Sequence, residues 1–160
     1  MSIQAGDRMP EGSFATMTAD GPGSLSTEER FAGKKVVLFS VPGAFTPTCS
    51  KSHLPGFVQH AAALKAKGVD TIACMSVNDV FVMDAWGRDQ GVGDDVVMLA
   101  DGNATYAEAL GLSLDATGFG MGTRGQRFAL IVDDGVATQV HVEGPGEFKV
   151  SSAEAILAAL

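Results

Sequence analysis

Short apolar runs, separated by glycine and polar residues, indicate the elements that this chain is expected to form. Three of them are almost wholly apolar, and they cover residues 36–41, 71–77 and 96–100. Runs of this kind predict strands that are buried on both faces of a sheet. Two further runs, at residues 128–132 and 137–142, flank Asp133-Asp134-Gly135, and this arrangement predicts an antiparallel hairpin. A weak alternation near residues 14–18, followed by turn residues 20–23, suits another hairpin.

Apolar residues at helical spacing lie between these runs. They predict a helix from Cys49 to about Lys67, with a kink or break at Pro55. Further helices are expected after the second and third runs, and residues 151–154 read as the capping box of a C-terminal helix. Strands that alternate with helices and end in a hairpin and a helix indicate an α/β fold with a mixed central sheet flanked by helices. The length of 160 residues suits a single domain over residues 1–160.

Composition and charge exclude several classes of protein. The formal net charge is −8, and no basic stripe is present, which argues against binding to nucleic acid or to an anionic membrane. No apolar run approaches the roughly 20 residues of a membrane helix. The N-terminal residues lack the basic and apolar regions of a signal peptide, so we expect a cytoplasmic protein.

The reactive side chains are few, and their spacing does not suit a metal or a nucleotide. The cysteines and histidines are Cys49, Cys74, His53, His60 and His141. Without an export signal, a structural disulfide is not expected, and the unrelated spacings of the histidines argue against a zinc site. The glycine-rich residues 118–125 do not open a helix in a βαβ unit and lack a P-loop lysine, so no nucleotide cofactor is expected.

Cys49 is the candidate nucleophile. It follows the apolar run 36–41 through a turn rich in proline and glycine, and it stands at the start of the expected helix. Unpaired backbone N–H groups and the positive end of the helix dipole stabilise an anion at this position. A free thiol has a pKa of about 8.5, and a helix N-terminus with one cationic neighbour can lower it by a unit or more.

The residues around Cys49 in the sequence suit peroxide chemistry. Thr46 has a hydroxyl that can both donate and accept a hydrogen bond, as the reduction of an O–O bond requires. Pro42 can fix the turn and shield the thiolate from water. Arg127, at the start of the run 128–132, is the candidate for a permanent cation. His53 lies one helical turn after Cys49 and could orient that arginine.

Plainer interpretations remain open for several of these residues. A single cysteine at a helix start is more often a small buried hydrophobe than a nucleophile, and the pattern P-x-x-x-T-x-x-C is what favours the nucleophile here. His53 could equally be a structural histidine with satisfied hydrogen bonds. Arg124 reads as a surface charge. Cys74 lies between apolar residues in mid-strand, so we expect it to be buried and inert rather than a redox partner.

Several motifs extend over nearly the whole chain. They are residues 42–50, residues 53–57, Ser76-Val77-Asn78-Asp79, Ala100-Asp101-Gly102, Leu110-Gly111-Leu112 and Arg127-Phe128-Ala129-Leu130. Together they resemble the peroxiredoxins, and more narrowly the peroxiredoxin-5-like group with the plant type II peroxiredoxins. The resemblance implies a thioredoxin-like fold and an antioxidant thiol peroxidase that uses no metal or organic cofactor. It implies that Cys49 attacks hydrogen peroxide or an alkyl hydroperoxide and becomes a sulfenic acid, with Pro42, Thr46, Arg127 and the Cys49 backbone N–H completing the site.

The resemblance also bears on how the sulfenic acid is reduced. Some relatives have a resolving cysteine where this chain has Phe148-Lys149-Val150-Ser151, and others have one in the strand that carries Cys74. A disulfide needs Cα atoms within about 7 Å, which the mid-strand position of Cys74 does not favour. We therefore expect an external reductant, either glutathione with glutaredoxin or thioredoxin. The alternative is a peroxide sensor or redox relay that uses Cys49; a binding module without activity would be expected to lack Thr46 or Arg127.

Members of this group form two-fold dimers through the surface around the active-site turn. The resemblance therefore implies a homodimer whose contact includes Phe45, Pro47 and the helix that carries Phe81 and Trp86. By themselves Phe81 and Trp86 read as core or interface residues, and the dimer favours the interface, because an exposed aromatic patch usually marks one.

Overall fold

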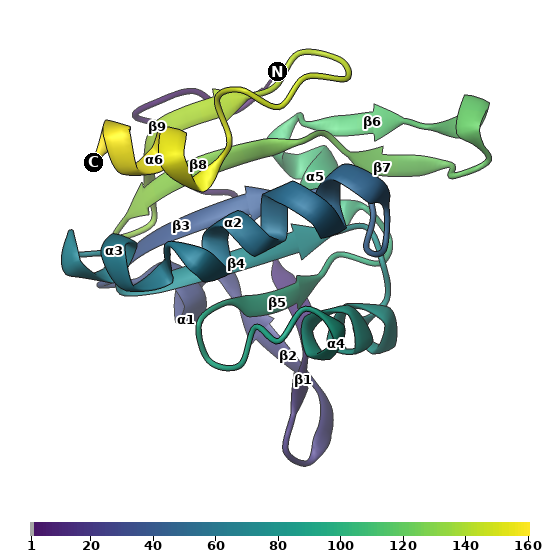
Figure 1. Ribbon diagram of the computed structural model, residues 1–160, viewed down its shortest axis with the longest axis horizontal. Helices are drawn as coiled ribbons and strands as arrows, with labels where there is room; N and C mark the ends of the chain where they lie inside the picture. The colour runs from purple at the N-terminus through teal and green to yellow at the C-terminus, as the bar shows by residue number, and fades with distance from the viewer. Residues whose placement is uncertain (1) are drawn as a thin grey trace.

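A seven-stranded sheet runs through the centre of the structure, a computed structural model that describes residues 2–160 (Figure 1). Its strands in chain order are β1 (Ser13–Thr18), β2 (Gly21–Ser26), β3 (Lys35–Ser40), β4 (Thr71–Ser76), β5 (Val97–Ala100), β8 (Phe128–Asp133) and β9 (Val136–Val142). In space they lie in the order β2-β1-β5-β4-β3-β8-β9. The strands β3, β4 and β5 are parallel, whereas β1 and β8 are antiparallel to their neighbours. The expected α/β fold with a mixed sheet is confirmed.

Helices cover both faces of this sheet (Figure 1). The helices on one face are α2 (Leu54–Gln59), α3 (Ala61–Ala66), α4 (Val80–Asp89) and α6 (Ala153–Ala159). The helices on the other face are α1 (Thr27–Phe31) and α5 (Thr105–Leu110). Within residues 2–160, none of the helices has the length and apolar character needed to cross a membrane.

Strand β3 contributes to the hydrophobic cores on both faces, which explains its continuous apolar sequence. Val37 and Phe39 pack against the helices that follow the candidate cysteine, whereas Val36 and Leu38 pack against the opposite layer. All four side chains are fully buried. Because side chains alternate along a strand, a strand with helices on both faces needs apolar residues at nearly every position.

The helical segment that begins near Cys49 breaks at a different residue from the one expected. It consists of a π-helical turn η1 (Cys49–His53), then α2 and then α3, with the break between α2 and α3 at His60. The break is therefore at His60 and not at Pro55, next to which the segment changes from π-helical to α-helical at Leu54. Pro55 lies two residues after the π-helical turn, with helical residues on both sides of it.

The glycine-rich residues 118–125 belong partly to a second, small sheet. Strands β6 (Ser113–Asp115) and β7 (Thr123–Gly125) form a two-stranded hairpin, with the 3-10 turn η2 (Thr117–Phe119) between them. This hairpin extends away from the main sheet at the upper right of Figure 1. Strands as short as these leave no periodic pattern in the sequence, which is why this stretch reads as a loop.

Candidate active site

The turn between β3 and the following helix is fixed by hydrogen bonds. The Ala44 N–H donates to Asn78 Oδ1 over 2.9 Å, and this bond ties the turn to the segment after β4. The Thr46 hydroxyl donates to the Gly43 carbonyl over 2.7 Å. Between these contacts Phe45 has a φ of 62°, in the left-handed region that large side chains seldom occupy. The turn is thus held in one strained conformation by its surroundings.

Cys49 lies in the first turn of the helical segment, which begins at Pro47. The first hydrogen bond of this segment runs from the Ser50 N–H to the Thr46 carbonyl over 2.9 Å. The Cys49 side chain is fully buried, and the π-helical turn η1 begins at this residue. Single π-helical turns are frequent at functional sites, and N–H groups in a first turn are available to an anion.

Arg127 contacts the thiol directly. Its Nη2 group donates a hydrogen bond to Cys49 Sγ over 3.1 Å. The pairing of the strands explains this contact, because Phe128, the residue after Arg127, is the partner of Ser40 at the end of β3. The antiparallel pairing of β8 with β3 thus brings Arg127 to the same edge of the sheet as the turn that leads to Cys49.

His53 connects Arg127 to the C-terminal part of the chain. Its Nδ1 atom lies 2.9 Å from Arg127 Nη1, and its Nε2 atom lies 2.9 Å from the Ser151 carbonyl oxygen. A guanidinium can only donate and a carbonyl can only accept, so Nε2 carries the proton and Nδ1 accepts. Burial and then the Arg127 charge lower the pKa of His53 to about 3, so the imidazole is neutral near neutral pH.

A mostly apolar pocket of ≈ 380 Å³ opens beside these residues. Pro42, Thr48, Arg127 and Phe148 are among the residues that line it. The Phe148 ring packs edge-on against the His53 ring, with centroids 4.9 Å apart, and its centroid is 5.9 Å from Arg127 Cζ. Arg127 lines this pocket and also donates to Cys49 Sγ, so a small molecule in the pocket could contact Arg127 next to the buried thiol.

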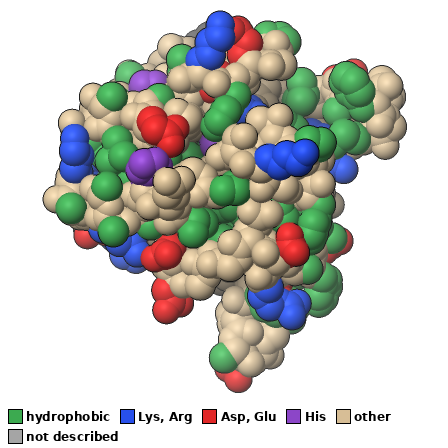
Figure 2. All heavy atoms as spheres, in the orientation of Figure 1, with side chains coloured by type: hydrophobic (Ala, Val, Ile, Leu, Met, Phe, Trp, Pro, Cys, Tyr) green, Lys and Arg blue, Asp and Glu red, His purple; other side chains and the backbone are tan. Residues whose placement is uncertain are grey.

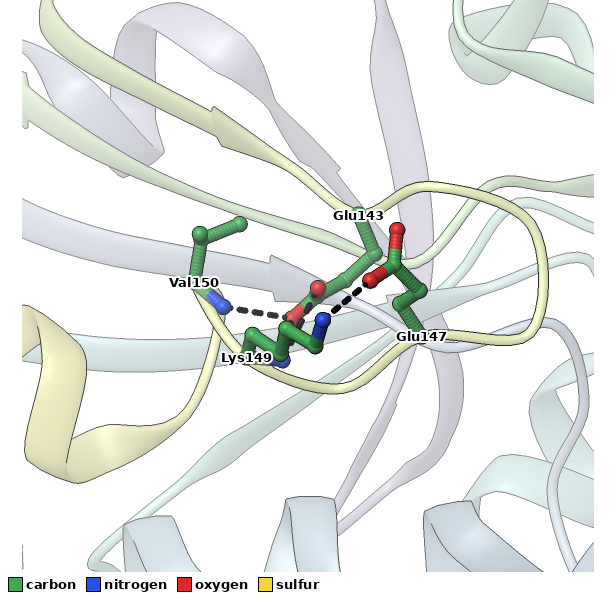
Figure 3. Close-up of polar contacts among 4 residues, drawn as sticks. All are labelled: Glu143, Glu147, Lys149 and Val150. Carbon is green, nitrogen blue, oxygen red and sulfur yellow. Dashed lines mark hydrogen bonds and ion pairs between the residues drawn. The ribbon is translucent and has the colours of Figure 1, made fainter.

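The loop after β9 carries the remaining polar contacts of the site (Figure 3). Glu143 follows β9 directly, and its carboxylate accepts hydrogen bonds from the N–H groups of Lys149, Val150 and Ser151. Burial alone would raise the pKa of Glu143, but the hydrogen bonds, the Ser151 hydroxyl bond first among them, outweigh it and keep the pKa below the ordinary value. Glu143 is therefore an ionised, nearly buried carboxylate close to the site.

Two expectations about neighbouring residues are wrong. Arg124 is not a surface charge: it is half-buried and donates to the carbonyls of Met121 and Val77. Trp86 is not exposed: it is fully buried, and its indole N–H donates to Ser50 Oγ over 3.0 Å. In each case the side chain contacts a segment distant in sequence, which the local pattern could not indicate.

Cys74 lies in mid-strand β4, in the same hydrophobic cluster as Cys49. Its side chain is fully buried, and both cysteines are free thiols. Burial first, and then the nearby Cys49, raise the pKa of the Cys74 thiol well above its usual range. In this conformation Cys74 is a poor nucleophile, because the thiolate is the reactive form.

The sequence pattern did not reveal all the residues that surround the thiol. Asn78 lies in a motif that gave no sign of its contact with Ala44, and Phe148 lies in a loop without periodicity. Ser151 was expected to open the capping box of the C-terminal helix, but the residue that caps α6 is Ser152. Glu143 offered one signal, because it is an acidic residue that directly follows an apolar strand. Its burial depends on the return of the chain at residues 149–151, which no local pattern predicts.

Comparisons with known proteins agree over nearly the whole chain. The Redoxin family model matches residues 4–157. Peroxiredoxin-2B of Arabidopsis thaliana is 50% identical over 159 residues, which cover 99% of this chain and 98% of that protein. The chloroplastic peroxiredoxin-2E of the same plant is 46% identical over 163 residues, covering 99% of this chain and 70% of that protein. The crystal structure of reduced Prx3 from Vibrio vulnificus in complex with H2O2 is 54% identical, with a TM-score of 0.95 and 98% of each chain covered.

Proposed function

This chain belongs to the Redoxin family and, within it, to the peroxiredoxin-5-like peroxiredoxins, and from this membership we propose that Cys49 is its peroxidatic nucleophile. The protein is a thiol-dependent peroxidase. The observation that carries the assignment of Cys49 is the 3.1 Å hydrogen bond from Arg127 Nη2 to Cys49 Sγ. A guanidinium is charged at every working pH, so it favours the thiolate over the thiol.

The proposed reaction begins with attack of the Cys49 thiolate on one oxygen of hydrogen peroxide or of an alkyl hydroperoxide. The S–O bond forms as the O–O bond breaks, and the departing oxygen takes up a proton and leaves as water or as an alcohol. Cys49 is then a sulfenic acid. A first external thiol forms a mixed disulfide with release of water, and a second restores the Cys49 thiol and leaves as the disulfide of the reductant.

We assign Thr46, Arg127 and Pro42 to the stabilisation of this reaction. The hydroxyl proton of Thr46 is donated to the Gly43 carbonyl, so the lone pairs of Thr46 Oγ1 can accept the peroxide proton. The remaining N–H groups of Arg127 can bind the peroxide oxygens as negative charge develops on them. Pro42 lines the pocket and would limit the access of water.

We further propose that an external thiol, from glutaredoxin with glutathione or from thioredoxin, reduces Cys49. The burial and the raised pKa of Cys74 support this route, because an internal disulfide would require β4 to open. The segment 148–151 contains no cysteine. Cys49 is fully buried as well, so a thiol from outside the chain requires movement of the turn that carries Cys49, but β4 can stay paired in the sheet.

A homodimer is the assembly that we propose. Phe45 and Phe81 support it, because their side chains are 53% and 64% exposed and lie near the active-site turn and on α4. Figure 2 shows hydrophobic side chains along the right edge of the molecule, over the β6–β7 hairpin and near α4. Exposed apolar patches of this kind usually mark an interface. Trp86 is buried and cannot take part in such a contact.

We propose that the whole chain acts as one thioredoxin-fold domain in the cytoplasm. The single-domain proposal is supported by the main sheet, whose strands come from residues between 13 and 142. Among the relatives, a peroxiredoxin-2E of Arabidopsis thaliana and a peroxiredoxin-2E-2 of Oryza sativa are chloroplastic, so the compartment is a matter for experiment. Subcellular fractionation of the source cells tests this assignment.

Peroxide-dependent consumption of NADPH tests the proposed function. The glutaredoxin–glutathione and thioredoxin systems are compared side by side with wild-type protein, Cys49→Ser and Cys74→Ser. We expect turnover of wild-type protein and Cys74→Ser with at least one system, and none for Cys49→Ser. Reduction of a single equivalent of peroxide, without recycling by either system, would instead support the sensor or relay function.

A further inference from the structure

The buried carboxylate of Glu143 is connected to Arg127 by hydrogen bonds through Ser151 and His53. No step of the proposed reaction uses it. We propose that Glu143 is a positioning residue that fixes the orientation of Arg127 against Cys49. It acts through Ser151 and His53 rather than by contact with the peroxide. This inference rests on the roles proposed above for Cys49 and Arg127.

The first step of the argument is the contact between Glu143 and Ser151. Oε2 of Glu143 accepts bonds from the Ser151 hydroxyl over 2.7 Å and from the Ser151 N–H over 2.9 Å. The same oxygen accepts from the N–H groups of Lys149 over 2.8 Å and Val150 over 2.9 Å, and Oε1 accepts from Lys149 over 2.9 Å (Figure 3). Glu143 is 8% exposed and Ser151 is fully buried. Three consecutive N–H groups on one carboxylate fix the path of the main chain at Ser151.

The second step is the contact between Ser151 and His53. The Ser151 carbonyl accepts the proton of His53 Nε2, so the position of this carbonyl sets the direction of the imidazole. It also sets the tautomer, because Nε2 must carry the proton and leave Nδ1 as the acceptor. Nδ1 then accepts from Arg127 Nη1 over 2.9 Å.

The third step is the dependence of Arg127 on this histidine. Arginine has a long side chain with many rotamers, so its charged end is placed only by the groups that contact it. Those groups are Cys49 Sγ, His53 Nδ1 and, at 5.9 Å from Cζ, the ring of Phe148. Phe148 belongs to the loop that Glu143 closes, so two of these three contacts depend on the same carboxylate.

The negative charge of Glu143 and its positioning of Arg127 should have opposite effects on the pH at which Cys49 ionises. A nearby negative charge disfavours a thiolate, so if Glu143 acted only as a charge, its removal would make Cys49 ionise at a lower pH. If Glu143 holds Arg127 in place, its removal makes Cys49 ionise at a higher pH. The direction of the change therefore separates the two roles.

The test uses Glu143→Met, which has no acceptor, and Glu143→Gln, whose amide oxygen can still accept from the donors at Oε2. Two measurements are made: the second-order rate constant for oxidation of Cys49 by hydrogen peroxide, and the pH at which half of Cys49 reacts with iodoacetamide. We expect Glu143→Met to slow oxidation by about tenfold or more, as the loss of an outer hydrogen-bond partner does at metal sites, and to raise the alkylation midpoint. The rate constant and the alkylation midpoint of Glu143→Gln should lie between those of Glu143→Met and those of the wild type.

Two control variants separate positioning from general damage. Lys149→Met removes the ion pair between Lys149 Nζ and Glu147 but keeps the N–H group that donates to Glu143. Val132→Ala lowers stability at the far end of β8, where Val132 pairs with Val36. Both controls should leave the alkylation midpoint unchanged. If Glu143→Met does not fold, Ser151→Ala removes one of the bonds to Glu143 and should move both measurements in the same direction by less.

Two results would overturn the inference. A lower alkylation midpoint in both Glu143 variants would show that only the charge matters. A loss of thermal stability in Glu143→Met with the rate constant and midpoint of wild type would show a structural role alone. The alkylation midpoint does not depend on turnover, so it remains informative even if the peroxidase assay contradicts the roles proposed for Cys49 and Arg127.

Discussion

The indole N–H of Trp86 donates a hydrogen bond to Ser50 Oγ over 3.0 Å, which joins α4 to the residue that follows Cys49. Trp86 is fully buried and is the only tryptophan in the chain. The emission of a single buried indole depends on its local contacts. Fluorescence of the protein should therefore report on the π-helical turn in which Cys49 lies.

Ser50→Ala tests this connection between α4 and the active-site turn. The variant should lose about 1 kcal/mol of unfolding free energy, because the indole N–H is left without its partner. Its emission spectrum should shift from that of wild type. Addition of peroxide to the wild type should change Trp86 emission at the rate at which Cys49 is oxidised, measured by stopped flow. An equal change in Cys49→Ser would show that the signal does not come from this thiol.

The role of Cys49 predicts a sharp difference between the two cysteine variants. Cys49→Ser should have no measurable peroxidase activity, because an alcohol is not ionised near neutral pH. Cys74→Ser should keep the first oxidation at the wild-type rate, since Cys74 is buried with a raised pKa. Rapid mixing with hydrogen peroxide measures the rate of peroxide reduction by each variant. Mass spectrometry of oxidised wild type should find sulfenic acid or a mixed disulfide, and a dominant Cys49–Cys74 disulfide would contradict reduction by an external thiol.

Arg127→Met should slow the attack on peroxide by roughly 10²-fold or more, since the loss of one preorganised donor costs on the order of 3 kcal/mol. The pH at which half of Cys49 reacts with iodoacetamide should rise in this variant. Arg124→Met is the matched control, because it removes an arginine that bonds to backbone carbonyls rather than to the thiol. Arg124→Met should lower thermal stability, and it should slow the oxidation of Cys49 by less than Arg127→Met does. Equal rate losses in both variants would contradict the distinction between the two arginines.

His53 should make the protein less stable in acid. Its pKa is about 3 in the folded protein and about 6.5 when unfolded, so between these values only the unfolded chain takes up the proton. The contribution is complete above pH 6.5 and is lost as the pH falls toward 3. Between pH 8 and pH 5 the loss amounts to about 2 kcal/mol. Urea unfolding of wild type and His53→Gln at both pH values measures it, and the decline should be smaller in His53→Gln by that amount. An identical decline in both proteins would contradict the lowered pKa.

Phe81→Glu tests the proposed dimer at an exposed position. A charge on this face of α4 should weaken association without disturbing the core, because Phe81 is 64% exposed. Sedimentation equilibrium should show a larger dissociation constant for the variant than for wild type. Glu108→Gln, an exposed change on α5 at the opposite face of the sheet, should leave association unchanged. A wild-type protein that stays monomeric at tens of micromolar and is fully active would refute the dimer.

The strands and the cysteine turn could be predicted because their signals are local. The apolar run that forms β3 and the turn from Pro42 to Cys49 are continuous in sequence, and a strand buried on both faces needs such a run. The family resemblance rests on the same continuous motifs. The break of the helix at His60 could not be predicted, because Pro55 carries the stronger local signal for a break and yet lies inside a continuous helical segment.

The sequence by itself determined the α/β fold, the peroxiredoxin family and the chemical types of the candidate residues. Only the tertiary structure decided that Arg127 Nη2 meets Cys49 Sγ, because that contact depends on the antiparallel pairing of β8 with β3. It also decided that Arg124 and Trp86 make hydrogen bonds inside the protein. The enclosure of Glu143 likewise depends on the return of the chain at residues 149–151. Burial and hydrogen bonding join residues far apart in sequence, so periodicity and motif spacing carry no information about them.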